Sequence, residues 1–121
     1  MLPRSSSLLP HPPAASQMWV HSCCSLARLE RALDSPEVTA IETDIIMADG
    51  IPIMCHPPAR SSDLTFERFL ELVLAEGTKH VKLDFKSFAA VEPCLLMLAE
   101  VEERLRSNQQ VGLLLGALCD G

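Results

Sequence analysis

Two carboxylates interrupt a largely apolar segment of the chain, "IETDIIM" at 41–47. Glu42 and Asp44 are two residues apart, so on a β-strand both side chains point to the same face. A third carboxylate, Asp84, lies in a second alternating segment, "KHVKLDFKS" at 79–87. Carboxylate oxygens are the ligands that Mg²⁺ and Ca²⁺ prefer. These residues predict a divalent-cation site if the two segments lie side by side.

Two histidines follow short apolar segments, His21 after "MWV" and His56 after "IPIMC". Imidazole takes up and releases protons near neutral pH, so this pair is suited to general acid and base catalysis beside a bound cation. A plainer interpretation is also open. The carboxylates then belong to a solvated strand face, the histidines to loops, and Lys82 and Lys86 form a surface ladder with Asp84.

The elements that would position these residues alternate between strand and helix patterns. Alternating or β-branched segments predict strands at 18–22, 38–47, 51–55, 79–87 and 110–118. Apolar residues at helical spacing predict helices at 25–36, 64–77 and 91–108. The Asp49-Gly50 pair predicts a tight hairpin between 38–47 and 51–55.

This order predicts an α/β fold with parallel strands, because strands that alternate with amphipathic helices pair in parallel. We expect roughly the N-terminal half of a (β/α)₈ TIM-type barrel, with about four main parallel strands, a short hairpin strand and three helices. A whole barrel needs about 250 residues. Residues 1–17 are expected to form a flexible tail, and residues 18–121 the incomplete barrel domain. The candidate site residues would lie at the carboxyl ends of the strands, where barrel active sites are built.

Composition narrows the classes of function. The chain has 121 residues, of which 48% are hydrophobic, and a net charge of -6, which argues against a nucleic-acid surface. It contains no apolar run near the ~20 residues of a membrane span, and its first 17 residues do not match a secretory signal. Five cysteines without a CxxC pattern favour reduced thiols over zinc binding, so a cytoplasmic location is slightly preferred.

Several stretches between Trp19 and Pro93 resemble the menorin family: "WVHS", "IETDIIM", "PIMCHPP", "SDLTFERFL" and "VKLDFKSFAAVEP". That family is similar to the glycerophosphodiester phosphodiesterases and related phospholipases, which are TIM-type barrels. The pattern of this larger superfamily is a histidine after the first strand, then E-x-D, a DG turn, a second histidine, and an acidic residue two positions before a lysine.

The resemblance implies a role for each matching residue. The implied general acid and base are His21 and His56, and the residue facing the substrate phosphate is Lys86. The implied ligands of a divalent cation, Mg²⁺ or Ca²⁺, are Glu42, Asp44 and Asp84. The implied reaction is attack of a hydroxyl on a phosphodiester or phospholipid-derived small molecule, with the cation neutralising the developing charge.

The chain departs from these patterns at three places. Ser22 stands where the phosphodiesterases have an arginine, which removes a bidentate phosphate donor. Cys24 stands where the menorin pattern has an asparagine. The chain ends in "LLLGALCDG" at 113–121 instead of an Asn-Ala-Asp stretch. We therefore expect a truncated or alternatively terminated product.

Three interpretations of function follow from the sequence. The retained histidines, carboxylates and lysine favour a metal-dependent, phosphodiesterase-like enzyme. The missing arginine favours a non-catalytic interaction module with a protein partner, extracellular or at the cell surface. The short length favours a fragment without a function of its own.

Overall fold

The computed structural model describes residues 17–108, 110 and 114–115 of the chain. The predicted N-terminal tail lies almost wholly outside the described residues, and so does most of the predicted last strand at 110–118. Within the described part, no helix has the length and apolar character needed to cross a bilayer.

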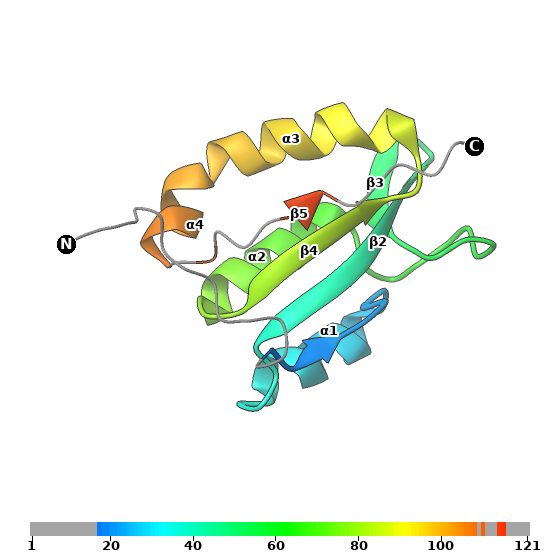
Figure 1. Ribbon diagram of the computed structural model, residues 1–121. Coiled ribbons are helices and arrows are strands. Elements are labelled where there is room, and N and C mark those ends of the chain that lie inside the picture. The colour runs from blue at the N-terminus through cyan, green and yellow to red at the C-terminus, as the bar shows by residue number, and fades with distance from the viewer. Residues whose placement is uncertain (1–16, 109, 111–113, 116–121) are drawn as a thin grey trace.

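A five-stranded sheet forms the centre of the described structure (Figure 1). Its strands are β1 (Trp19–Val20), β2 (Ala40–Ala48), β3 (Ile51–Met54), β4 (His80–Phe85) and β5 (Leu114–Leu115). The order is β1-β2-β4-β5, and each of these neighbours pairs in parallel. β3 lies off this path and pairs antiparallel with the second half of β2, from Ile45 to Ala48.

The prediction of a half (β/α)₈ barrel is wrong. A TIM-type barrel consists of parallel strands, each followed by a helix, whereas the described chain forms a small α/β domain with a mixed, open sheet. The cause lies in the turn after β2. Asp49 and Gly50 both have positive φ, 50° and 82°, as a two-residue type I′ turn requires, so β3 folds straight back onto β2. The hairpin was predicted, but its antiparallel strand was wrongly treated as an addition to a parallel barrel.

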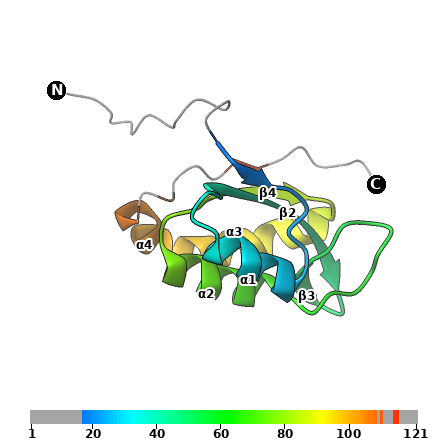
Figure 2. The same cartoon turned by 90° about the horizontal axis from the view of Figure 1, so that it is seen from below.

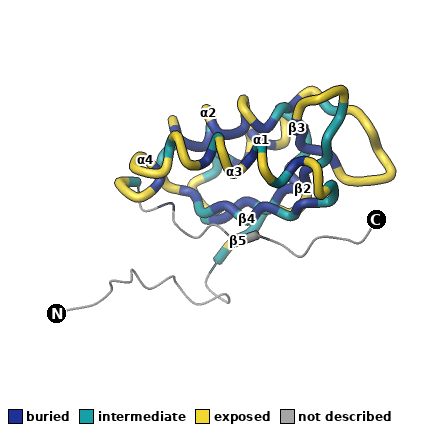
Figure 3. Tube along the Cα trace, turned by 90° about the horizontal axis from the view of Figure 1, so that it is seen from above, coloured by how far each residue is buried: buried dark blue, intermediate teal, exposed yellow. Residues whose placement is uncertain are grey.

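All described helices lie on one side of the sheet (Figures 2 and 3). They are α1 (Leu26–Asp34), α2 (Phe66–Glu76), α3 (Val91–Glu100) and α4 (Glu102–Ser107), with a short 3₁₀ helix, η2 (Phe88–Ala90), before α3. α1 and α2 begin where predicted because the Ser25 and Thr65 side chains cap their first turns. The helix predicted at 91–108 is divided at Val101, whose backbone leaves the helical region (φ −115°, ψ 13°).

The hydrophobic core lies between the helices and the apolar face of the sheet. Ile41 and Ile45 of β2 and Leu83 and Phe85 of β4 are buried there. The helices add a larger set of buried side chains, which includes Leu29, Phe66, Phe69, Val73, Cys94 and Leu98. Because side chains alternate along a strand, burying this face presents Glu42, Asp44 and Asp84 on the opposite, helix-free face.

A buried lysine ties the N-terminal ends of β2 and β4 together. The Lys79 ammonium donates to the backbone carbonyls of Ser35 and Val38, at 2.8 and 2.7 Å. Its Nζ also lies 3.9 Å from Oε2 of Glu76, at the end of α2. These contacts fix the segment before β2 against the start of β4, so they support the strand register on which the candidate site depends.

Candidate metal-binding site

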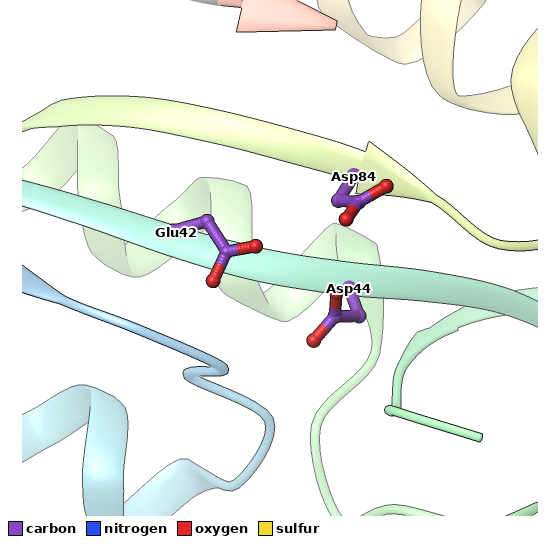
Figure 4. Close-up of side chains that lie close together, drawn as sticks. All are labelled: Glu42, Asp44 and Asp84. Atoms are coloured by element: carbon purple, nitrogen blue, oxygen red, sulfur yellow. The ribbon is translucent and has the colours of Figure 1, made fainter. Parts of the chain in front are cut away.

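Three carboxylates converge on the helix-free face of the sheet (Figure 4). In the parallel pairing of β2 with β4, Asp44 lies directly opposite Asp84, and Glu42 comes two residues earlier on β2. One oxygen from each of the three carboxylates lies within 4.8 Å of the others. The residues that the sequence singled out as cation ligands are thus neighbours in space, and their role as ligands remains a prediction.

Asp44 is the most enclosed member of the cluster, with only 1% of its surface exposed. Burial raises the pKa of its carboxyl group above the ordinary value, and the charges of Glu42 and Asp84 raise it further. His56 and Lys86 act in the opposite direction. Folding therefore makes the carboxylate form of Asp44 less favourable than it is in the unfolded chain.

Glu42 is held by the segment that follows β1. The backbone N–H of Ser22 donates to Oε1 of Glu42 at 2.8 Å, and Nδ1 of His21 lies 3.7 Å from the same oxygen. Ser22 adopts a φ of 51°, an uncommon left-handed conformation for a residue with a side chain. The guanidinium group of Arg28 donates to the carbonyl of His21 and so fastens this turn to α1.

Asp84 pairs with the lysine two residues further along the chain. Nζ of Lys86 lies 3.0 Å from Oδ2 of Asp84, and both side chains are mostly buried. The backbone N–H of Lys86 donates to the carbonyl of Ile45 at 2.8 Å, which continues the β2–β4 ladder past the end of β4. Lys86 therefore lies at the edge of the carboxylate cluster.

The two candidate histidines approach the cluster from different segments. His21 lies beside Glu42 and stacks on the Trp19 ring, with 73% of its side chain exposed. His56 follows β3 and is exposed; the N–H of the preceding Cys55 donates to the carbonyl of Asp44 at 2.9 Å. The antiparallel hairpin thus returns His56 to the level of Asp44.

The structure adds Cys24 to the surroundings of the cluster. Its Sγ lies 3.8 Å from Oδ2 of Asp44 and 3.8 Å from Oγ1 of Thr43. Burial raises the pKa of the Cys24 thiol, so at neutral pH it is protonated and can donate weakly to Asp44. The sequence marked Cys24 only as a departure from the family pattern, and nothing in its spacing indicated this contact.

The donor set fits a hard divalent cation. It offers three carboxylates, and one of them, Asp44, is almost fully buried, with the Cys24 thiol 3.8 Å from its Oδ2. Lys86 compensates Asp84 directly, but the three negative charges still exceed the local positive charge. A bound Mg²⁺ or Ca²⁺ would offset the burial and the charge repulsion that together raise the pKa of Asp44.

Replacing Asp44 with Asn should stabilise the metal-free chain at neutral pH. The pKa of Asp44 is higher in the folded chain than in the unfolded chain, so protonation of this carboxyl stabilises the fold. This stabilisation is fully present at pH values below the unfolded-state pKa, and it is lost as pH rises through the folded-state pKa. Wild type should therefore be less stable than Asp44→Asn at pH 7 in EDTA, and the difference should shrink toward pH 4. Urea unfolding across this pH range measures it. Glu30→Gln, which removes an exposed charge on α1, is the control; a wild type more stable than Asp44→Asn at pH 7 would contradict the expectation.

Comparison with known proteins places the chain in a family. Residues 14–117 match the Menorin N-terminal domain. The chain therefore belongs to the menorin family, as the resemblance in the sequence indicated. It is similar to the human protein FAM151B, with 39% identity over 93 residues. That alignment covers 73% of this chain but 33% of FAM151B, so the chain spans about a third of this relative. No solved structure matches the chain.

Proposed function

We propose that this menorin-family chain carries the cation- and phosphate-binding part of a phosphodiesterase-type site. The observation that supports the proposal is the convergence of three carboxylates within 4.8 Å of one another, with Lys86 at 3.0 Å from one of them. Glu42, Asp44 and Asp84 would hold the cation, and Lys86 would contact a phosphate oxygen of the substrate. We also propose that the menorin family is related to the glycerophosphodiester phosphodiesterases, as the sequence resemblance implies.

The proposed reaction is hydrolysis of a phosphodiester. The oxygen of a water molecule attacks phosphorus, the bond from phosphorus to the leaving alcohol oxygen breaks, and a monoester and an alcohol result. One histidine takes the proton of the nucleophile and the other gives a proton to the leaving oxygen, and both candidates are exposed enough to reach a substrate. A divalent cation supplies stabilisation of the negative charge that develops on the phosphoryl oxygens.

Metal-dependent stabilisation tests the proposal. Mg²⁺ or Ca²⁺ at one hundred times its Kd should raise the free energy of unfolding of wild type by about 2.7 kcal/mol, because a ligand that binds only the folded state stabilises it. The double variant Glu42→Gln/Asp44→Asn should show no rise in melting temperature. The variant Asp34→Asn/Glu37→Gln, which removes two exposed carboxylates elsewhere, should behave like wild type. Equal melting temperatures of wild type with and without both cations would overturn the metal site.

A second candidate is a non-catalytic interaction module that uses the cluster only for structure or for cation binding. One observation favours it: Ser22 occupies the position after His21 and uses its backbone N–H to bind Glu42, so no bidentate donor for phosphate stands there. Metal-dependent stabilisation without any hydrolysis of a glycerophosphodiester would favour this module over the enzyme.

A further inference from the structure

A groove adjoins the carboxylate cluster at the carboxyl ends of β2 and β4. Its volume is about 620 Å³, which lies in the range of small-molecule sites. Its walls come from three segments: the end of β2 and the following turn (46–49), the loop 57–60, and Lys86 with Ser87 after β4. Lys86 also pairs with Asp84 of the cluster, so the groove and the cluster share a border.

One part of the groove is apolar. Ile46 lines it from β2, and Pro57 and Pro58 line it from the loop. Ile46 lies two residues after Asp44 and on the same face of β2, so this apolar surface begins directly beyond the carboxylates. Such a surface would bury an apolar group of a ligand whose other end reaches the cluster.

The other part of the groove carries positive charge. Arg60 and Lys86 both line it, and Asp49 is the acidic residue of its lining. Arg68 and Arg106 are paired with glutamates, whereas Arg60 has no carboxylate partner among the described residues. Ser87 accepts a hydrogen bond from the N–H of Met47 at 3.1 Å, which leaves its own hydroxyl proton available for donation. The guanidinium group of Arg60 and the Ser87 hydroxyl beside an apolar wall favour an anionic ligand with an apolar substituent.

We infer that this groove binds a phosphate ester with an apolar ester group, and that Arg60 is the residue that supplies the bidentate contact to its phosphate. The inference rests on the proposed function, since it names the class of substrate for the same site. Arg60 presents the planar fork that matches a phosphate. A polar ester group such as glycerol would gain less from the wall formed by Ile46 and the two prolines.

The test measures anion binding without metal. Phenyl phosphate, glycerol 2-phosphate and inorganic phosphate are titrated into the full chain in EDTA, and binding is followed by amide chemical shifts. Phenyl phosphate should bind several-fold tighter than the other two ligands and shift the amides of 46–49 and 59–60. Arg60→Gln should weaken phenyl phosphate about tenfold. Arg104→Gln, which removes an exposed arginine of α4 on the other side of the sheet, should leave the Kd unchanged.

Two results would overturn the inference. One is an equal Kd for phenyl phosphate in wild type and Arg60→Gln, and the other is equal binding of phenyl phosphate and glycerol 2-phosphate. Ile46→Gln should reduce the preference for phenyl phosphate while leaving inorganic phosphate unaffected. Because these titrations contain no cation, their failure is distinct from that of the proposed function. If the metal stabilises wild type but phenyl phosphate does not bind, the inference alone is overturned. If phenyl phosphate binds but the metal does not stabilise wild type, the metal site alone is overturned.

Discussion

His56→Ala should lower the rate of glycerophosphodiester hydrolysis by about 10²–10⁴-fold in the presence of Mg²⁺ or Ca²⁺. The proposed mechanism uses His56, which follows β3 and lies next to the buried carboxylate of Asp44, as a proton-transferring group, and the variant lacks it. Because His56 is exposed, its removal should leave the free energy of unfolding within about 0.5 kcal/mol of wild type. The measurement is release of the alcohol product under saturating cation, with urea unfolding of both proteins alongside.

Added imidazole distinguishes proton transfer from a structural effect of this substitution. It should restore part of the rate to His56→Ala and leave the wild-type rate unchanged, because the small base can enter the space left by the side chain. Equal rates for wild type and His56→Ala would count against the catalytic role of His56. A wild-type rate equal to that of buffer with cation would reject the enzyme and favour the interaction module.

Phe85→Ala should lower the free energy of unfolding by about 3–5 kcal/mol, the usual cost of removing a large aromatic side chain from a core. Phe85 is 1% exposed and lies on the apolar face of β4, between Asp84 and Lys86 in sequence. Since a domain of this size has a total stability of only about 5–15 kcal/mol, this loss is a large fraction of it. Urea unfolding monitored by circular dichroism measures the change.

Phe88→Ala is the matched control for the core substitution. It removes the same side chain three residues later, from a position that is 79% exposed in η2. Its effect should stay within about 0.5 kcal/mol. A Phe88→Ala variant as unstable as Phe85→Ala would contradict the assignment of the core to one face of β4.

Local patterns in the sequence predicted most of the elements, because each has its own signal. The segment 64–77 contains a cap at Thr65, an apolar stripe and a stop at Gly77, and α2 occupies Phe66–Glu76. The turn at Asp49-Gly50 needs only two residues that tolerate positive φ, and the hairpin was predicted. The break at Val101 was missed, because the apolar spacing of 91–108 continues through it.

The arrangement of the strands was harder to predict. Alternation of strand and helix signals favours parallel pairing, but it does not state which strands lie side by side or whether a sheet closes. The sequence therefore predicted half of a parallel barrel, whereas the described strands form an open, mixed sheet.

Only part of the candidate site could be predicted from the sequence. Glu42 and Asp44 share a face because of strand periodicity alone, whereas the approach of Asp84 depends on the register of β2 against β4. The position of Arg60 in the groove depends on the path of a loop, which has no periodic pattern.

The carboxylate cluster forms only when β2 and β4 pair in the native register. Asp44 meets Asp84 in only one alignment of the two strands. A slip by one residue would turn the β4 side chains over, place Asp84 among the helices and bring Phe85 to the helix-free face. Misaligned chains would therefore lack one carboxylate of the cluster, and a divalent cation added during refolding would select the native alignment from its competitors.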